Sequence, residues 1–306
     1  MTEASSANWA QRPERGSALL LRLMTRLSLW FGRKPARVLL HPIVLYFLLC
    51  SPAARRSSRA YLARALDRPP RWLDLYRHFH SFSAALLDRI YLLNQRFDLF
   101  EFEVEGEDII RGAIAEGQGV FLIGAHIGSF EALRALGRKE SGLDVAMAMF
   151  EENAGKIMAT LTAINPALKQ DVIPLGRIDS MLQLSERLDS GTMVGMLADR
   201  TLGEENLQPV SLLNDTAYLP TGAFRMAALL RRRVVFMAGL YLGRNRYRLV
   251  FQPLADFSAV ASGQRQQALQ DALARYAALM EACCRDAPYN WFNFFDFWQA
   301  PERSKP

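Results

Sequence analysis

His126 and Glu131 are the two side chains of this sequence best suited to acid–base chemistry. His126 follows an apolar run at residues 119–123, and glycines flank it at positions 124 and 128. A carboxylate on one imidazole nitrogen fixes the tautomer and raises the basicity of the other nitrogen. Five residues turn an α-helix by about 500°, so the pair meets only if His126 lies in a turn before the helix. The alternative is a helix-capping histidine and a surface glutamate.

The other three histidines have simpler interpretations. His41 lies in an apolar run, and His78 and His80 lie among aromatic residues of a predicted helix. Packing accounts for such positions, so His126 is the candidate general base.

Ser129 offers a different chemistry, that of a hydrolase nucleophile. The nucleophile elbow of such enzymes requires the pattern G-x-S-x-G. Here Gly128 directly precedes the serine, and Glu131 stands where the second glycine belongs. We therefore favour Ser129 as the N-cap of a helix, and a lipid esterase acylated on Ser129 is kept as an alternative.

The sequence predicts neither a cofactor nor a metal ion. It contains no phosphate-binding loop, no dinucleotide fingerprint and no zinc-ligand spacing. Its three cysteines, Cys50, Cys283 and Cys284, do not have the spacing of metal ligands. We expect them to be reduced thiols in a protein that faces the cytoplasm.

Strands and helices alternate along most of the chain, with apolar runs at strand length and amphipathic segments at helical spacing. We expect strands at residues 100–106, 119–123, 144–150, 192–198, 234–242 and 247–253, and helices at 72–100, 108–116, 129–138, 179–188, 221–230 and 264–285. This pattern predicts a single α/β domain with a largely parallel sheet flanked by helices. Ligands bind beyond the carboxyl ends of such strands, and His126 lies just past one of them.

The first quarter of the chain is basic and apolar at once. Residues 1–77 carry 14 Lys and Arg residues against four acidic residues, interleaved with Leu, Trp and Phe. A nucleic-acid-binding arm would not contain so much Leu. A helix in the membrane interface suits this composition, because anionic headgroups add about 1 kcal/mol per basic residue. The predicted partner is an anionic membrane surface, with no nucleic acid.

The apolar run at residues 38–50 is too short to span a membrane by itself, since a span needs about 20 residues. We expect an interfacial or re-entrant hairpin, and a single tilted span stays open. A secretory signal does not fit, because the run begins far from Met1 and is followed by Arg55 and Arg56. A lipoprotein cleavage box needs a small residue before its cysteine, and Leu49 precedes Cys50.

The stretch at residues 124–131 resembles the H-x4-D/E block of the lysophospholipid acyltransferase superfamily. It is most similar to the lipid A biosynthesis (late) acyltransferase branch, in which an aromatic residue and a glutamate end the block. Three further stretches resemble blocks of that branch in the same order: the apolar strand ending in Asp-Arg at 195–200, the substrate-side block at 217–223, and the C-terminal signature at 275–281 and 287–291. Four blocks in order are a more specific signal than one.

The resemblance implies an O-acyltransferase on the cytoplasmic face of the cell inner membrane. The donor would be an acyl thioester of acyl carrier protein or coenzyme A, and the acceptor a hydroxyl of a membrane lipid or glycolipid. His126 would take the hydroxyl proton and Glu131 would orient His126, with no covalent acyl-enzyme. Residues 1–70 would form the membrane-associating helical segment and residues 71–306 the acyltransferase α/β domain. Substrate-binding roles would fall to Ser129, Arg134, Asp199, Arg200, Pro220 and Arg225.

Two features leave alternatives open. An arginine at 200 can hold headgroup oxygens with its planar fork of donors, but Asp199 and Arg200 could instead form a structural ion pair. The aromatic residues at 291–298 could pack against the sheet or contact the bilayer or acyl chain.

Two departures from the branch affect the acceptor and the activity. Glu151 and Glu152 stand where the branch usually carries an arginine, and the block at 212–214 reads Leu-Leu-Asn rather than ending in glycine. Acidic side chains would repel the phosphates of a bisphosphorylated lipid A. An acylated glycolipid, an aminolipid and a lipid-linked pigment are therefore as plausible as lipid A as the acceptor. A catalytically silent lipid- or carrier-binding homologue is the alternative to an enzyme.

Overall fold

The computed structural model describes residues 18–139, 144–150, 159–165, 171–176, 179–200 and 206–299. The basic residues Arg12 and Arg15 and the acidic residues Glu151 and Glu152, which bear on the predictions above, lie outside these ranges.

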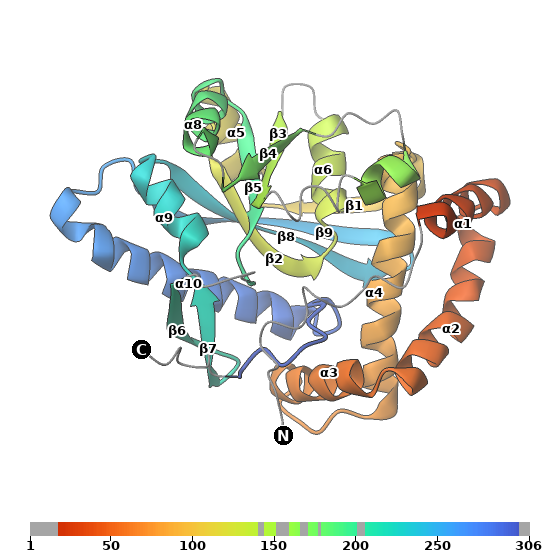
Figure 1. Cartoon of the computed structure of the whole chain (residues 1–306). Coiled ribbons are helices and arrows are strands. Elements are labelled where there is room, and N and C mark those ends of the chain that lie inside the picture. Colours follow the sequence, from red (N-terminus) through yellow and green to blue (C-terminus); the bar gives the residue numbers. More distant parts are fainter. Residues whose placement is uncertain are drawn as a thin grey trace.

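A seven-stranded sheet forms the centre of the protein (Figure 1). Its strand order is β1-β9-β8-β2-β5-β3-β4. The strands are β1 Glu101–Glu105, β2 Phe121–Gly128, β3 Val145–Phe150, β4 Val172–Leu175, β5 Met193–Leu197, β8 Arg233–Gly243 and β9 Arg246–Asp256. Strands β8, β2, β5, β3 and β4 are parallel, β9 is antiparallel to β8, and β1 is parallel to β9. The predicted α/β fold with a largely parallel sheet is confirmed.

Helices cover the sheet, and the core residues divide between its two faces. The helices are α4 Trp72–Leu93, α5 Glu107–Ala115, α6 Phe130–Lys139, α8 Ser180–Asp189, α9 Gly222–Leu229 and α10 Arg265–Asp286. On β2, Phe121 and Ile123 join the cluster that includes α9 and α10, whereas Leu122 joins the cluster that includes α4 and α6. A strand buried on both faces reads as the continuous apolar run seen in the sequence.

The aromatic residues near the C-terminal end belong to the same core. Trp291 and Phe297 are buried members of the cluster around α10, and Phe294, Phe295 and Trp298 pack against it. Packing against the sheet, one of the two predicted roles of this segment, is confirmed.

Three predicted boundaries were wrong or incomplete. The first helix, α4, ends at Leu93 instead of residue 100, because Gln95 adopts a left-handed φ of 59° and turns the chain. Strand β2 continues to Gly128, where we expected a tight connection from residue 124. The sequence also gave no sign of the separate hairpin of β6 Leu207–Leu212 and β7 Asp215–Pro220.

In the described part of the chain, three helices precede α4: α1 Ala18–Phe31, α2 Arg33–Cys50 and α3 Pro52–Ala65. Within the described residues, no single helix is long and apolar enough to cross a membrane, although α2 and α3 together meet that test as a pair bent by 95°. Every fourth residue of α2 faces the protein, since Ala36, Leu40, Val44 and Leu48 are buried. Large apolar side chains of α1 and α2 face outward: Leu23, Leu27, Leu29, Trp30, Phe31, Val38, Leu39, Leu45, Tyr46, Phe47 and Leu49.

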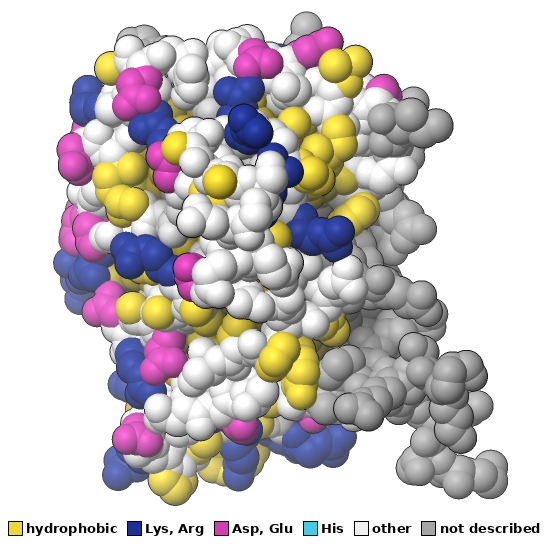
Figure 2. All heavy atoms as spheres, turned by 90° about the vertical axis from the view of Figure 1, so that its left-hand side faces the viewer, with side chains coloured by type: hydrophobic (Ala, Val, Ile, Leu, Met, Phe, Trp, Pro, Cys, Tyr) yellow, Lys and Arg dark blue, Asp and Glu magenta, His cyan; other side chains and the backbone are white. Residues whose placement is uncertain are grey.

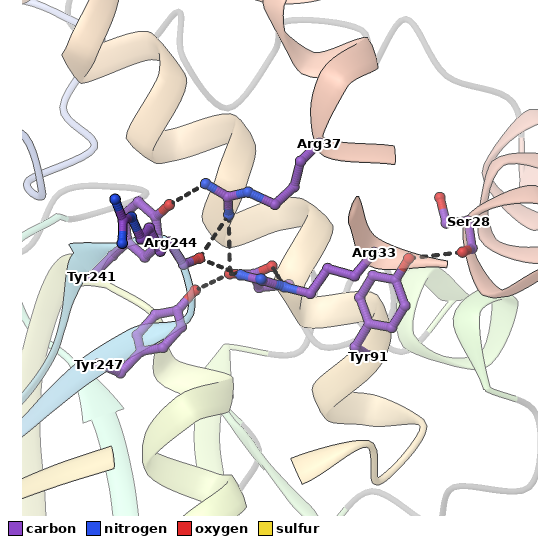
Figure 3. Close-up of polar contacts among 8 residues, drawn as sticks. Ser28, Arg33, Arg37, Tyr91, Tyr241, Arg244 and Tyr247 are labelled. Carbon is purple, nitrogen blue, oxygen red and sulfur yellow. Dashed lines mark hydrogen bonds and ion pairs between the residues drawn. The ribbon is translucent and has the colours of Figure 1, made fainter. Parts of the chain in front are cut away.

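A buried carboxylate links α2 to α4 and to β9 of the sheet (Figure 3). Asp88 of α4 has no exposed side-chain surface and accepts two hydrogen bonds of 2.8 Å from Arg33 and one of 2.9 Å from Tyr247 of β9. Arg37 donates to the Tyr241 hydroxyl at 2.7 Å and to the carbonyl oxygen of Arg244 at 2.9 Å. Burial raises the pKa of Asp88, and the Arg33 contacts oppose that shift.

Replacement of Asp88 by alanine should lower the free energy of unfolding by about 3–5 kcal/mol, because it leaves the Arg33 charge buried without its partner. The matched control is Asp98→Ala, which removes an exposed carboxylate from a similar pair with Arg96 and should leave the unfolding midpoint close to that of wild type. Urea unfolding of both variants measures the difference. Equal midpoints would contradict the role assigned to Asp88.

Candidate active site

His126 is the third residue from the end of β2, where that strand loses its regular pairing with β8. The register between β2 and β8 shifts between Gly124 and Gly128. Gly128 has a φ of 67°, and a Cβ atom there would overlap the carbonyl oxygen of Gly239. Only glycine allows this close approach, and His126 lies within the local bulge between Gly124 and Gly128.

Strand pairing places His126 beside Asp199. Gly124 of β2 is paired in parallel with Leu197 of β5, and the nitrogen of Ala198 still donates to the oxygen of Gly124 at 2.9 Å. Two residues further on, the Nδ1 atom of His126 lies 2.7 Å from Oδ1 of Asp199. The carboxyl ends of two adjacent parallel strands therefore supply the two groups.

In the His126 imidazole, Nδ1 is hydrogen-bonded to Asp199 and Nε2 is available to a substrate. The Asp199 side chain is fully buried, whereas the His126 side chain keeps 37% of its surface exposed. A carboxylate accepts only, so Nδ1 donates and Nε2 carries the lone pair. Among the described residues, Nε2 has no hydrogen-bond partner. This is the arrangement of a general base open to a substrate proton.

The second oxygen of Asp199 is also held. Trp291 Nε1 donates to Oδ2 at 3.1 Å, and Arg200 Nε lies 3.7 Å from the same atom. Arg200 also donates through Nη2 to the carbonyl oxygen of Phe292 at 2.7 Å, with its guanidinium 5.1 Å from the Phe295 ring centroid. Asp199 and Arg200 thus contact each other, as the ion-pair alternative predicted, but His126 is the closer partner of Asp199.

The neighbouring charges keep His126 neutral and Asp199 ionised. Burial lowers the pKa of His126 and the Arg200 charge lowers it further, while Asp199 opposes both. Burial acts to raise the pKa of Asp199, but the charge and hydrogen bond of His126, together with Arg200 and Trp291, hold it well below its usual range. The imidazole is therefore uncharged at neutral pH, which is the form that can accept a proton.

Glu131 lies in the first turn of α6, 5% exposed. Its described partners are two arginines: Arg89 of α4 at 3.3 Å and Arg134 at 3.5 Å. The described contacts thus give His126 a carboxylate partner in Asp199 and group Glu131 with arginines. Whether Glu131 also orients His126 during the reaction stays a prediction.

The remaining predicted substrate-binding residues come from the start of α6, the end of β7 and α9. Ser129 is buried and its Oγ accepts a hydrogen bond from the nitrogen of Ala132 at 3.2 Å, so it caps α6 as predicted. Pro220 is buried at the end of β7, and Arg225 is exposed on α9. Their contacts with substrate stay predictions.

Metal-dependent catalysis and catalysis by a cysteine thiol have little support among the described residues. Within the described ranges, no three His, Cys, Asp or Glu side chains are grouped as metal ligands. Burial raises the pKa of Cys283 to about 12 and that of Cys284 above its usual range. A thiol so protonated is a poor nucleophile.

Sequence reasoning missed two contributors, Trp291 and Arg89. Trp291 stood inside the predicted C-terminal signature, where only packing or lipid contact was considered. Arg89 lies in a helix 42 residues before Glu131, and no local spacing connects the two.

A comparison with protein families identifies the family of the chain. Residues 90–300 match the model of the family described as bacterial lipid A biosynthesis acyltransferase. The chain belongs to this family. The match spans β2, β5 and Trp291, so it contains every residue of the His126–Asp199 site, and the predicted family is confirmed. Membership makes the protein an acyltransferase that acts on a lipid, with an acyl donor. No curated protein gives a significant match to this chain.

The pKa of His126 should move in opposite directions when its two charged neighbours are removed. Asp199→Asn deletes the negative charge that favours imidazolium, so the pKa should fall. Arg200→Met deletes a positive charge that disfavours imidazolium, so the pKa should rise. NMR titration of the imidazole measures both, with exposed Asp108→Asn as a control that should change nothing. Folded variants that both keep the wild-type pKa would refute this electrostatic account.

Proposed function

We propose that this lipid A biosynthesis acyltransferase family member is an O-acyltransferase with His126 as general base. It would transfer a fatty acyl group from an acyl thioester of acyl carrier protein or coenzyme A to a hydroxyl of a membrane lipid or glycolipid. The observation that carries this proposal is the partly exposed, neutral imidazole whose Nδ1 is bonded to buried Asp199.

In the proposed step, Nε2 of His126 takes the proton of the acceptor hydroxyl as its oxygen attacks the thioester carbonyl. The tetrahedral intermediate then collapses, and its carbon–sulfur bond breaks. The leaving thiolate takes the proton back from the imidazolium. The products are an ester on the lipid and a free thiol on the carrier, and the enzyme returns to its starting state.

Asp199 would position the imidazole, and Glu131 would help to orient it. A buried carboxylate on Nδ1 selects the tautomer and stabilises the imidazolium formed during attack. Glu131 would keep its predicted support of His126 from the start of α6, where it also holds Arg89 and Arg134. Arg200, Arg225, Ser129 and Pro220 are proposed to line the path of the acceptor.

The lipid esterase alternative has less support than the transferase. A nucleophilic serine needs an exposed Oγ next to its base. Ser129 is 5% exposed and its Oγ accepts a hydrogen bond from the α6 backbone. A silent homologue is disfavoured because the base and its carboxylate are both present and hydrogen-bonded.

The outward face of α1 and α2 supports a membrane-bound location, which we propose to be the cytoplasmic face of the inner membrane. Trp30 is 78% exposed and Phe31 59%, and basic residues flank both. α1 and α2 lie on one side of the molecule in Figure 1. The opposite side shows basic and acidic side chains interspersed, with hydrophobic ones only in small groups (Figure 2). An anionic bilayer fits the first surface and not the second.

His126→Ala and Glu131→Ala should both reduce transfer without unfolding the protein, and by different amounts. Loss of the base should lower kcat by about 10²–10⁴-fold. Loss of Glu131 leaves the base in place, so more activity should survive. Steady-state transfer of acyl groups to a lipid extract, alongside thermal melts, measures both. A folded His126→Ala protein within a few-fold of wild type would contradict the mechanism, and a fluorophosphonate adduct on Ser129 would favour the esterase.

Replacement of Trp30, Phe31 and Phe47 by serine should release the protein from anionic vesicles. Each aromatic side chain contributes about 1.5–3 kcal/mol when buried, so binding should fall at least about tenfold. Flotation with vesicles containing phosphatidylglycerol measures it. The control replaces Leu182 and Leu229, both 63% exposed outside α1 and α2, and should bind like wild type. Equal loss in both variants would remove α1 and α2 as the membrane-binding surface.

A further inference from the structure

Residues 290–292 form a short segment that pairs with the end of β2. The nitrogen of Gly128 donates to the oxygen of Asn290 at 2.8 Å, and the nitrogen of Phe292 donates to the oxygen of His126 at 2.9 Å. Ile127 and Trp291 form the antiparallel bridge between these bonds. This pairing lies where β2 has shifted its register with β8. The 290–292 segment therefore supplies the main-chain partner of the base itself.

Asn290 fixes this segment to β8. Its side chain is 3% exposed, its Oδ1 accepts from the nitrogen of Tyr241 at 2.7 Å, and its Nδ2 donates to the oxygen of Tyr241 at 3.0 Å. Sliding the segment along β2 would leave these buried groups unpaired, which is unfavourable.

Trp291 places a single donor against Asp199. The side chain is fully buried, and Nε1 donates to Oδ2 at 3.1 Å. The indole stands edge-on to Tyr61, at 5.2 Å between centroids, and to Phe297, at 4.7 Å. Full burial and these two ring contacts pack the indole beside the carboxylate.

The backbone of Trp291 and Phe292 is held from two sides. His78, fully buried in α4, donates through Nε2 to the oxygen of Trp291 at 2.8 Å, and its Nδ1 accepts from Ser58 Oγ at 2.8 Å. Burial lowers the pKa of His78 to about 4, so the ring is neutral at neutral pH, and the carbonyl acceptor at Nε2 fixes the tautomer. Arg200 donates to the oxygen of Phe292 at 2.7 Å.

We infer that the 290–292 segment positions the catalytic pair, and that Trp291 orients the Asp199 carboxylate toward His126. The inference rests on the proposed role of His126 as base. With Nε1 bonded to Oδ2, the other oxygen faces Nδ1 of His126. Without the indole donor, Oδ2 has Arg200 Nε as its next partner, 3.7 Å away. Rotation toward that guanidinium takes Oδ1 out of line with the imidazole.

The test compares Trp291→Phe with Trp298→Phe. Both remove one indole, but Trp298 Nε1 donates to the backbone oxygen of Leu212 at 3.4 Å and not to the site. Trp291→Phe should lower kcat about tenfold or more, with KM within about twofold, because the indole touches no substrate. The Nδ1 proton resonance of His126, read by NMR without substrate, should broaden or move upfield as its hydrogen bond to Asp199 weakens. Trp298→Phe should match wild type in both measurements.

If Trp291→Phe does not fold, a second variant with a smaller change at the same position tests the inference. Benzothienylalanine at position 291 keeps the shape of the indole and replaces its N–H by sulfur, so only the donor is lost. The same fall in kcat and the same change in the Nδ1 resonance would support the inference. A folded protein with wild-type kcat and resonance would overturn it.

The two claims fail separately. The Nδ1 resonance reports the position of Asp199 whether or not His126 is the base. If His126→Ala stays active while the Trp291 variants alter the resonance, the base assignment is wrong and the positioning of Asp199 stands. If His126→Ala is inactive while the Trp291 variants keep the resonance and kcat, the positioning inference alone is wrong.

Discussion

A charged carboxylate with no exposed surface is the constraint around which this site is built. An ionised Asp199 at this depth is stable only if hydrogen bonds and positive charge replace the water it has lost. His126, Trp291 and Arg200 provide them, and they come from three separate parts of the chain. The cost of burying Asp199 therefore ties the end of β2, the end of β5 and the 290–292 segment to one geometry.

The sheet satisfies this constraint through its strand order. β2 and β5 are adjacent and parallel, so their carboxyl ends reach the same edge, and their register brings residue 126 opposite residue 199. β2 leaves its register with β8 between Gly124 and Gly128 and rejoins β8 where Gly128 approaches Gly239 closely. The freed backbone of β2 then pairs with the 290–292 segment, and a partly exposed imidazole results. Main-chain pairing, more than side-chain packing, thus holds the His126 imidazole in place while part of its surface stays exposed to solvent.

Much of this could be predicted from the sequence, because local patterns encode it. Strand-length apolar runs and helical spacing gave the α/β fold, and the isolated position of His126 after a buried strand gave the candidate base. The partner of that base could not be predicted. Glu131 is near in sequence, while Asp199 becomes near only through the pairing of β2 with β5, and no spacing encodes which strands are neighbours. The β6–β7 hairpin was missed for a related reason: its turn uses Leu213 and Asn214 at φ values of 53° and 64°, and leucine is not a residue that signals such a turn.

The path of the chain through the site has a consequence for its synthesis. Trp291 follows Asp199 by 92 residues and His78 by 213. On the ribosome, the helices with exposed apolar faces and the strand carrying His126 emerge long before the indole that completes the hydrogen bonds of Asp199. Until then, that carboxylate lacks one of its partners and the end of β2 lacks its second neighbour. If α1 and α2 bind a bilayer as proposed, they can do so before Trp291 is available to complete the hydrogen bonds of Asp199.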